Sequence, residues 1–255
     1  MEVIICSTAE EVGRRAADRI VKELAGLSTP VLGVATGSSP LAVYRELAGK
    51  VAAGEIDFSH AMAFALDEYV GIDRSHPQSY AEAIRQTVTE PLGMDPKRVH
   101  VPNGMAADLH AAAAAYDAAI GEAGGVDVQI LGIGSNGHIG FNEPTSSFSS
   151  RTRVKTLTQQ TREDNARFFE DEADVPQHCV TQGLGTILDA KMALLVASGE
   201  QKADAVAAMV EGPVSAMCPG SVLQFHRRAV IYVDEAAASK LTLRDYYLDI
   251  MEHQL

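Results

Sequence analysis

One stretch of the chain combines an imidazole and a carboxylate with several glycines. His138 and Glu143 lie within residues 132–144, which read GIGSNGHIGFNEP. An imidazole titrates near neutral pH, at about 6.5 when unperturbed, so it can both accept and donate a proton. Glycines allow tight turns and let the backbone approach a ligand closely. The stretch therefore predicts acid–base chemistry. The simpler alternative is a surface loop that happens to contain a histidine.

Two further acids follow an apolar run earlier in the chain. Residues 61–66 read AMAFAL and predict a buried strand, and Asp67 and Glu68 come directly after it. Carboxylates at the end of a buried strand are costly unless they are paired or used. We therefore expect these acids to be either paired or functional.

A turn rich in hydroxyl groups lies between a predicted strand and a predicted helix. It consists of Thr36, Gly37, Ser38 and Ser39 and is followed by a proline. Backbone N–H groups and hydroxyls at the start of a helix form a ready anion site. The alternative is a helix cap with spare hydroxyls. Lys202, in the first turn of another predicted helix, opposes that helix's dipole unless an anion lies beside it.

These residues are set between apolar runs and helical patterns that alternate along the chain. This alternation predicts an α/β protein with an open, mostly parallel sheet and right-handed crossovers. The predicted strands are residues 3–6, 30–35, 61–66, 99–101, 126–133, 191–197 and 229–233. The predicted helices are residues 8–25, a helix from 41, one ending near 91, and 106–121, 161–170, 199–210 and 236 to the end. No linker separates two domains, so we expect one domain over residues 1–255.

Residues 145–187 interrupt the alternation and are a candidate lid over the site. Within them Arg151, Arg153 and Lys155 alternate with other residues, a period of two that fits an exposed strand. The simplest interpretation of these three cations is a solvated basic strand.

The bulk composition narrows the function class. A net charge of −13 disfavours nucleic acid and anionic membranes as partners, but it permits a small anion held by a few clustered cations. The longest apolar runs are strand-sized, and no secretory signal is evident at the amino terminus. The 3 cysteines are widely spaced without a Cys-x-x-Cys motif, as expected of reduced thiols in a cytoplasmic protein. No metal signature appears, so we expect no metal site.

The motifs, taken together, resemble the glucosamine-6-phosphate deaminase family. The resemblance covers essentially the whole chain. It rests on the blocks LDEYVG at 66–71, GIGSNGHIGFNEP at 132–144, SRTR at 150–153, RFF at 167–169 and SGEQKA at 198–203. It implies an open, mostly parallel sheet of the modified Rossmann type with helices on both faces, and a reaction without metal or organic cofactor. The implied reaction converts glucosamine 6-phosphate and water to fructose 6-phosphate and ammonia, in amino-sugar catabolism.

The resemblance also implies roles for the residues singled out above. His138 would open the sugar ring, with Glu143 orienting its imidazole. Asp67 would move a proton between the second and first carbons of the sugar. The substrate phosphate would lie on the turn at 36–39, with Arg167 and Lys202 as its cations.

Two features qualify this correspondence. Many members carry Asp where this chain has Asn136. We therefore expect Asn136 to hold geometry rather than transfer a proton, and Asn136→Asp to keep activity with a shifted pH profile. Arg151, Arg153 and Lys155 match a region where some members bind an allosteric N-acetylated sugar phosphate between subunits. A subunit contact without ligand is an alternative, and both a monomer and a homo-oligomer remain open.

Three other functions deserve comparison. A galactosamine-6-phosphate deaminase acts on a sugar that differs at one hydroxyl, and the sequence leaves it open. A 6-phosphogluconolactonase usually has Ser-Leu-Phe-Pro after the histidine and Asp-Glu-Arg at the earlier strand end, unlike the FNEP and DEY of this chain. A sugar-phosphate-sensing effector domain of a transcription regulator needs no acid–base set and accompanies a DNA-binding module.

Overall fold

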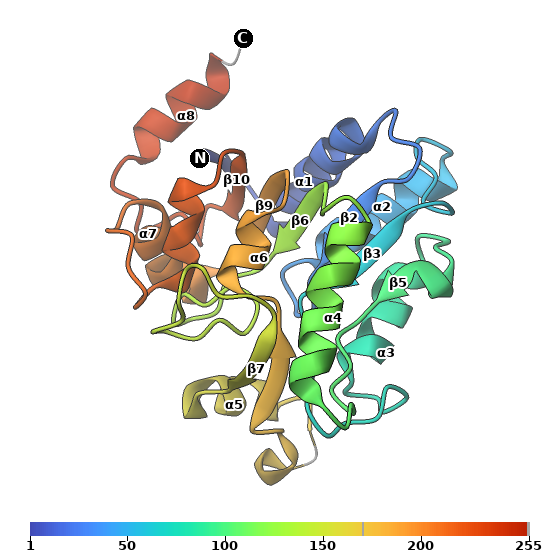
Figure 1. Ribbon diagram of the computed structural model, residues 1–255. Coiled ribbons are helices and arrows are strands. Elements are labelled where there is room, and N and C mark those ends of the chain that lie inside the picture. The colour runs from blue at the N-terminus through green and yellow to red at the C-terminus, as the bar shows by residue number, and fades with distance from the viewer. Residues whose placement is uncertain (170, 254–255) are drawn as a thin grey trace.

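A seven-stranded sheet forms the centre of the computed structural model, which describes residues 1–169 and 171–253 (Figure 1). Every paired neighbour in this sheet is parallel, which confirms the predicted sheet type. The strand order is β1-β10-β9-β6-β2-β3-β5. The strands are β1 (Glu2–Cys6), β2 (Val31–Val34), β3 (Met62–Ala65), β5 (Val99–His100), β6 (Val128–Leu131), β9 (Met192–Ala197) and β10 (Ala229–Asp234).

Helices cover both faces of this sheet, as predicted. One hydrophobic core joins the sheet to α1 and α2, and a second joins it to α6, α7 and the following 3-10 helix. α4 packs over β2 and β3 in a third cluster. The α-helices are α1 (Ala9–Leu24), α2 (Leu41–Ala52), α3 (Tyr80–Ile84), α4 (Leu109–Glu122), α5 (Gln159–Ala166), α6 (Leu184–Leu188), α7 (Ala203–Val210) and α8 (Arg244–Glu252). The short helices are a π-helix at Arg85–Thr89 and 3-10 turns at Pro96–Arg98, Glu172–Asp174, Glu200–Lys202 and Pro219–Phe225.

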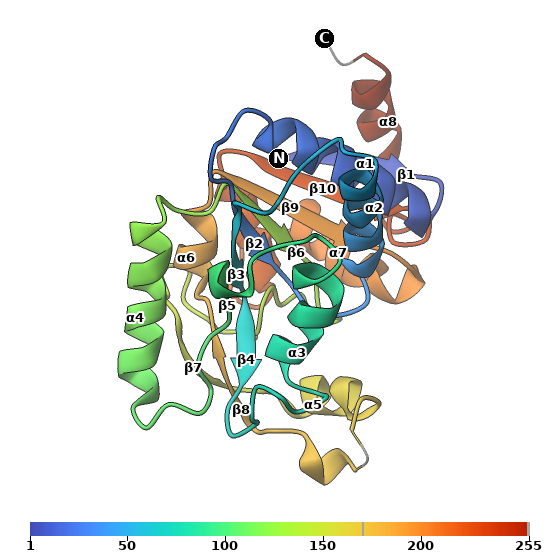
Figure 2. The ribbon, with the colours of Figure 1, turned by 90° about the vertical axis from the view of Figure 1, so that its right-hand side faces the viewer.

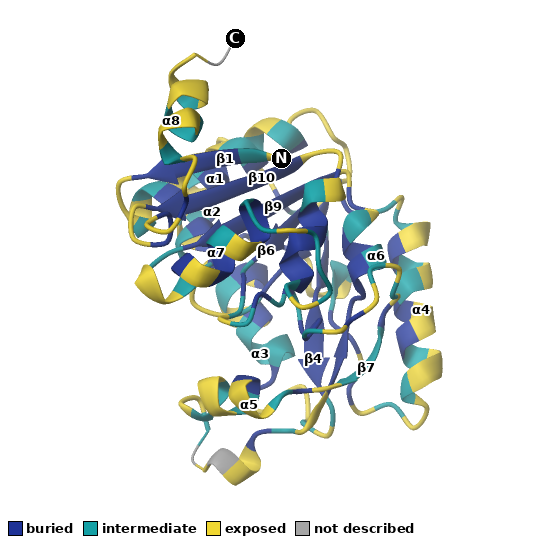
Figure 3. Ribbon diagram, turned by 90° about the vertical axis from the view of Figure 1, so that its left-hand side faces the viewer, coloured by how far each residue is buried: buried dark blue, intermediate teal, exposed yellow. Residues whose placement is uncertain are grey.

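Burial follows from the sequence pattern. The strands of the parallel sheet are buried on both faces, whereas α5 and α8 carry mainly exposed and partly exposed residues (Figure 3). A sheet covered on two sides needs continuous apolar strands such as MALLVA at 192–197, which is why these strands were predictable.

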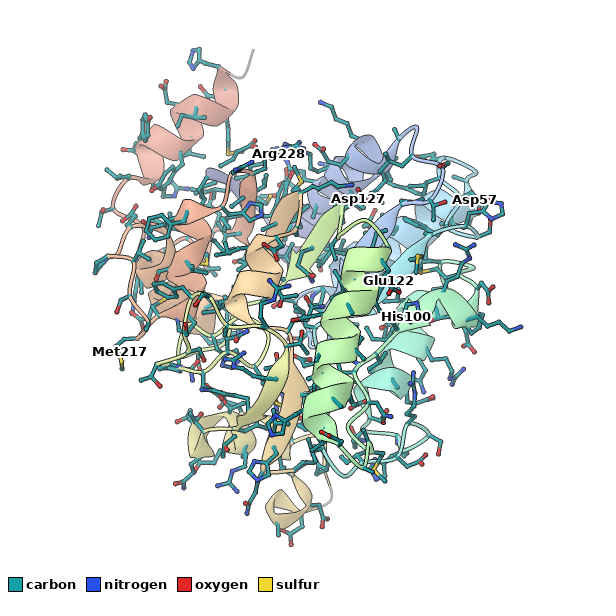
Figure 4. All side chains as sticks on the ribbon, viewed as in Figure 1. Asp57, His100, Glu122, Asp127, Met217 and Arg228 are labelled. Atoms are coloured by element: carbon teal, nitrogen blue, oxygen red, sulfur yellow. The ribbon has the colours of Figure 1, made fainter. Side chains whose placement is uncertain are left out.

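The order of the strands places a topological switch point between β2 and β6. These two strands are neighbours, but the chain continues from β2 towards β3 on one side and from β6 towards β9 on the other. Ligands of open α/β sheets bind at such switch points, outside the carboxyl ends of the strands. Asp127 and Arg228, which directly precede β6 and β10, mark the opposite, amino ends of the strands (Figure 4).

A second sheet, which the sequence analysis did not predict, lies beyond the carboxyl ends of the first (Figure 2). It has three antiparallel strands in the order β4-β8-β7, with β4 at Asp67–Tyr69, β7 at Arg153–Thr156 and β8 at His178–Thr181. β7 and β8 belong to the predicted lid segment 145–187, so part of that segment is a sheet that supports Asp67.

Two predicted helices differ from the structure. The helix predicted from 236 to the end begins only at Arg244, because turns occupy residues 235–240. The helix predicted at 161–170 is α5, which begins earlier, after its N-cap Thr158, and ends at Ala166. Residues 170, 254 and 255 of these predictions lie outside the described residues.

Candidate active site

The segment from Gly132 to Pro144, here called the glycine loop, leaves the carboxyl end of β6 and folds back on itself. The Gly134 amide donates to the carbonyl of His138 at 2.9 Å. A Cβ added at Gly134 would lie 2.3 Å from the His138 ring, and Gly137 has a φ of +83°. Glycine is therefore required at both positions, one for space and one for backbone conformation.

Within this loop two polar side chains, those of Asn136 and His138, meet around the carboxylate of Glu143. Oε2 of Glu143 accepts a hydrogen bond from Nδ2 of Asn136 at 2.8 Å and lies 3.5 Å from Nδ1 of His138. The backbone N–H of His138 donates to Oδ1 of Asn136 at 3.2 Å. Asn136 thus bridges the two partners of the predicted acid–base pair.

Glu143 is ionised in this setting although it is buried. Burial by itself would raise the pKa of Glu143, but His138, Thr161 and Asn136 together lower it to about 2. A carboxylate that stays charged can stabilise a positive charge on the imidazole beside it and fix its tautomer.

Asp67 approaches the same loop from β4. It pairs in register with Thr181 of β8, whose hydroxyl accepts from the Phe141 amide at 3.0 Å. A Cβ added at Gly140 would lie 3.6 Å from Oδ2 of Asp67, so the carboxylate lies against the glycine loop. Burial and the charge of Glu68 raise the pKa of Asp67 to about 8, although the Phe141 N–H partly opposes them. A buried group with such a pKa is a candidate for proton transfer near neutral pH.

The predicted phosphate-binding turn lies beside the beginning of the loop. A Cβ added at Gly132 would lie 3.9 Å from the Cβ of Ser39. Gly37 has a φ of +96°, and α2 begins after Pro40 without a side-chain cap on its first amides. The turn at 36–39 and the glycine loop are therefore neighbours at the carboxyl ends of β2 and β6.

The two predicted phosphate cations approach from different elements. Nζ of Lys202 donates to the carbonyl of Ile133 at 2.8 Å. Burial lowers the pKa of Lys202, Asp164 raises it, and Arg167 lowers it further, so Arg167 acts on Lys202 electrostatically. Arg167 caps the end of α5, with its guanidinium 4.7 Å from the centre of the Phe168 ring.

The three cations of the predicted allosteric region have separate surroundings. Arg151 forms ion pairs with Asp117 at 3.2 Å and Asp189 at 2.5 Å. Arg153 donates to Oδ1 of Asn142 at 2.9 Å, and burial lowers its pKa. Arg153 and Lys155 have no ion-pair partner within 4.0 Å among residues 1–169 and 171–253, with the side chain of residue 172 not considered. Of these three cations, Arg151 is therefore the one that acids in the described part of the chain neutralise.

An aromatic wall was not predicted from the sequence. The rings of Tyr69, Tyr80 and Phe141 pack against one another next to Asp67, and Phe169 contacts Tyr69 edge-on. The hydroxyl of Tyr80 donates to that of Tyr69 at 3.2 Å, and Nδ2 of Asn165 donates to the same hydroxyl at 3.0 Å. The signals in the sequence were the aromatic residues inside the quoted motifs, which are Tyr69 in LDEYVG, Phe141 in GIGSNGHIGFNEP and Phe169 in RFF.

Two kinds of feature are absent from the described part of the chain, namely a metal-binding cluster and a membrane-spanning helix. Its histidines, cysteines and acids form no group of three or more that could hold a metal ion. None of its helices has the length and apolarity needed to cross a membrane.

Comparison with known proteins supports one family. Residues 7–232 match the family model described as "Glucosamine-6-phosphate isomerases/6-phosphogluconolactonase". A glucosamine-6-phosphate deaminase from Cutibacterium acnes is 64% identical over 97% of this chain and 95% of the relative. One from Streptomyces coelicolor is 54% identical over 100% of this chain and 98% of the relative.

Solved structures agree in fold. A monomeric glucosamine-6-phosphate deaminase superposes with a TM-score of 0.92 and 40% identity, covering 94% of this chain and 100% of its own. The 6-phosphogluconolactonase from Trypanosoma cruzi has a TM-score of 0.75 at 18% identity, covering 94% and 97%, which shows a shared fold alone. With a family model matched over most of its length and full-length relatives above half identity, this chain belongs to the glucosamine-6-phosphate isomerase/6-phosphogluconolactonase family.

Proposed function

We propose that the protein is a glucosamine-6-phosphate deaminase, which converts glucosamine 6-phosphate and water to fructose 6-phosphate and ammonia. The observation that carries this proposal is the meeting of His138, Glu143 and Asp67 at one loop, next to a hydroxyl-rich turn and a partly buried lysine. The deaminases from Cutibacterium acnes and Streptomyces coelicolor, similar over nearly the whole chain, support it. Such an enzyme acts in amino-sugar catabolism in the cytoplasm.

Ring opening is the first step. It requires removal of a proton from the hydroxyl on carbon 1 and delivery of a proton to the ring oxygen. His138 can do both, because an imidazole exchanges protons near neutral pH. Glu143, held ionised 3.5 Å from Nδ1, orients the ring and stabilises its charged form.

Asp67 then transfers a proton between carbons. As a carboxylate it removes the proton from carbon 2, and as a carboxylic acid it delivers that proton to carbon 1. A pKa of about 8 makes both forms accessible at neutral pH. Carbon 2 is then an imine, to which water adds, and the carbon–nitrogen bond breaks to release ammonia. The sugar is left as fructose 6-phosphate.

The phosphate is held at the turn that follows β2. The turn at Thr36, Gly37, Ser38 and Ser39 presents hydroxyls and backbone N–H groups at the start of α2. Lys202 and Arg167 supply the positive charge. None of these steps requires a metal or an organic cofactor. Asn136 serves as a positioning residue through its hydrogen bonds to Glu143 and the His138 amide.

The test is ammonia release from glucosamine 6-phosphate and galactosamine 6-phosphate, by the wild type, Asp67→Asn and Asp73→Asn. Asp73 is an exposed carboxylate in a nearby turn and serves as the matched control. We expect the wild type and Asp73→Asn to release ammonia from glucosamine 6-phosphate, and Asp67→Asn to be nearly inactive. A wild type that releases no ammonia from either sugar contradicts the proposal. A preference for galactosamine 6-phosphate would make that sugar the substrate in place of glucosamine 6-phosphate.

A further inference from the structure

The two oxygen atoms of the Glu143 carboxylate contact two different segments of the chain. Its Oε2 atom faces the glycine loop, through Asn136 and His138. Its Oε1 atom faces Thr158, whose backbone nitrogen and hydroxyl oxygen both lie 3.3 Å away. The group that orients His138 is therefore itself held from outside the loop.

Thr158 is the N-cap of α5. Its hydroxyl accepts a hydrogen bond from the Thr161 amide at 3.2 Å and lies 3.0 Å from the Thr161 hydroxyl. The beginning of a helix carries partial positive charge, so this end of α5 favours an ionised carboxylate next to it. The titratable groups that act on Glu143 are His138 on the glycine loop and Cys179 on β8.

The far end of α5 carries one of the two predicted phosphate cations. Asp164 accepts a hydrogen bond from the Ser135 hydroxyl at 3.1 Å, and Asn165 donates to the Tyr69 hydroxyl at 3.0 Å. Arg167 follows directly as the C-cap. One short helix thus touches the glycine loop, the strand of Asp67 and the predicted phosphate cations.

Little apolar packing holds this helix in place. Thr161 is the one residue buried among those of α5, and the helix lies away from the main sheet (Figures 1 and 3). An element with few buried contacts has low local stability, so its polar contacts at both ends determine its position.

We propose that Thr158 is a positioning residue through which α5 couples phosphate binding at Arg167 to the orientation of the Glu143–His138 pair. Phosphate bound at Arg167 holds the C-terminal end of α5, and the N-terminal end then holds Oε1 of Glu143. Part of the binding energy of the remote phosphate is thereby used to raise kcat. This inference rests on the proposed function and concerns the same site.

A purely structural role for Thr158 is the alternative, and the chain offers a matched control. Thr8 is the N-cap of α1, and its hydroxyl accepts from the Glu11 amide at 3.2 Å, the same distance as the Thr158–Thr161 contact. Thr8 lies on a helix that carries none of the site residues. Thr8→Val therefore removes an equivalent helix cap without touching Glu143.

The first experiment compares kcat, KM and the pH profile of kcat for Thr158→Val, Thr158→Ser and Thr8→Val. We expect Thr158→Val to lower kcat about tenfold with KM changed less than about threefold, and to move the acidic limb to higher pH. Thr158→Ser restores both, whereas Thr8→Val lowers only Tm. An unchanged kcat and profile in Thr158→Val, or an equal loss in Thr8→Val, overturns the inference.

The second experiment is a double-mutant cycle of Thr158→Val with Arg167→Met. The two residues lie at opposite ends of α5, roughly 13 Å apart along a helix that rises about 1.5 Å per residue, so independent effects on kcat would multiply. We expect each single change to lower kcat and the double variant to lose no more than the worse single one. Multiplicative losses overturn the coupling. An inactive wild type contradicts the proposed function, whereas an active wild type with multiplicative losses contradicts only this inference.

Discussion

Asp67 and Glu68 are consecutive residues of β4, yet their carboxylates have different surroundings. Oε1 of Glu68 accepts from the amides of Tyr69 and Tyr80, both at 2.9 Å, and Oε2 accepts from the Ala81 amide at 2.8 Å. Glu68 therefore caps the start of α3. Asp67 points to the glycine loop with its pKa raised to about 8. One acid is structural and the other is available for chemistry.

The raised pKa of Asp67 makes a prediction about stability. The pKa is about 8 in the folded protein against an ordinary value of 3.8, so the folded state binds this proton more tightly than the unfolded chain. The stability that the proton contributes is complete below pH 4 and is lost as the pH rises towards 8. We expect Asp67→Asn to raise Tm by a few degrees at pH 8.5 and to change it little at pH 4.5. Scanning calorimetry of both proteins at the two pH values measures this, and an equal Tm at pH 8.5 would contradict it.

Asn136→Asp changes the electrostatics around Glu143. The substitution replaces an N–H donor, 2.8 Å from Oε2 of Glu143, with a carboxylate oxygen. Like charges at this distance raise the pKa of Glu143 from its value of about 2. We expect activity to be kept and the acidic limb of kcat/KM to move to higher pH. The control is Asn103→Asp, at an exposed turn. A pH profile of Asn136→Asp that is identical to that of the wild type would show that residue 136 is not coupled to His138.

Lys202→Met tests the phosphate site. Lys202 is partly buried, and burial lowers its pKa, so the lysine is unfavourable for the free protein unless an anion binds beside it. We expect KM for glucosamine 6-phosphate to rise about 10- to 100-fold, since charge-assisted contacts contribute about 1.5–3 kcal/mol, with no loss of Tm. Steady-state kinetics measure this, with Lys97→Met, an exposed lysine, as the control. An unchanged KM would place the phosphate elsewhere.

Gly140→Ala tests the approach of Asp67 to the glycine loop. Gly140 has a φ of +53°, and an added Cβ would lie 3.1 Å from Oγ1 of Thr181 and 3.6 Å from Oδ2 of Asp67. We expect kcat to fall about tenfold or more, because small misplacements of reacting groups have large effects on rate. Gly121→Ala is the control, since its Cβ would meet nothing within 4 Å and its position lies in α4. Full activity in Gly140→Ala would contradict this prediction, because it would show that the distance between Asp67 and the glycine loop can change without loss of rate.

The parallel sheet was largely predictable, whereas the exposed strand around 151–156 was the one part of the second sheet that was. A strand such as 192–197 is apolar throughout because helices cover both faces. β4 has only the residues Asp-Glu-Tyr, which carry neither an apolar run nor an alternation. It forms because β8, more than a hundred residues later, pairs with it. Contacts over such separations leave no local pattern.

The residues themselves determined which chemistry the site could perform. An imidazole, acids at the end of a buried strand and a hydroxyl-rich turn predicted acid–base chemistry next to an anion site, and the resemblance of the motifs to a known family implied that the substrate is a sugar phosphate. The roles of the two acids at 67 and 68 were decided only by the tertiary structure, because the amides of Tyr80 and Ala81 reach Glu68, whereas Asp67 lies buried against the glycine loop. The same holds for the glycine loop. Its Glu143 depends on Thr158, a residue from a helix that only folding brings to it.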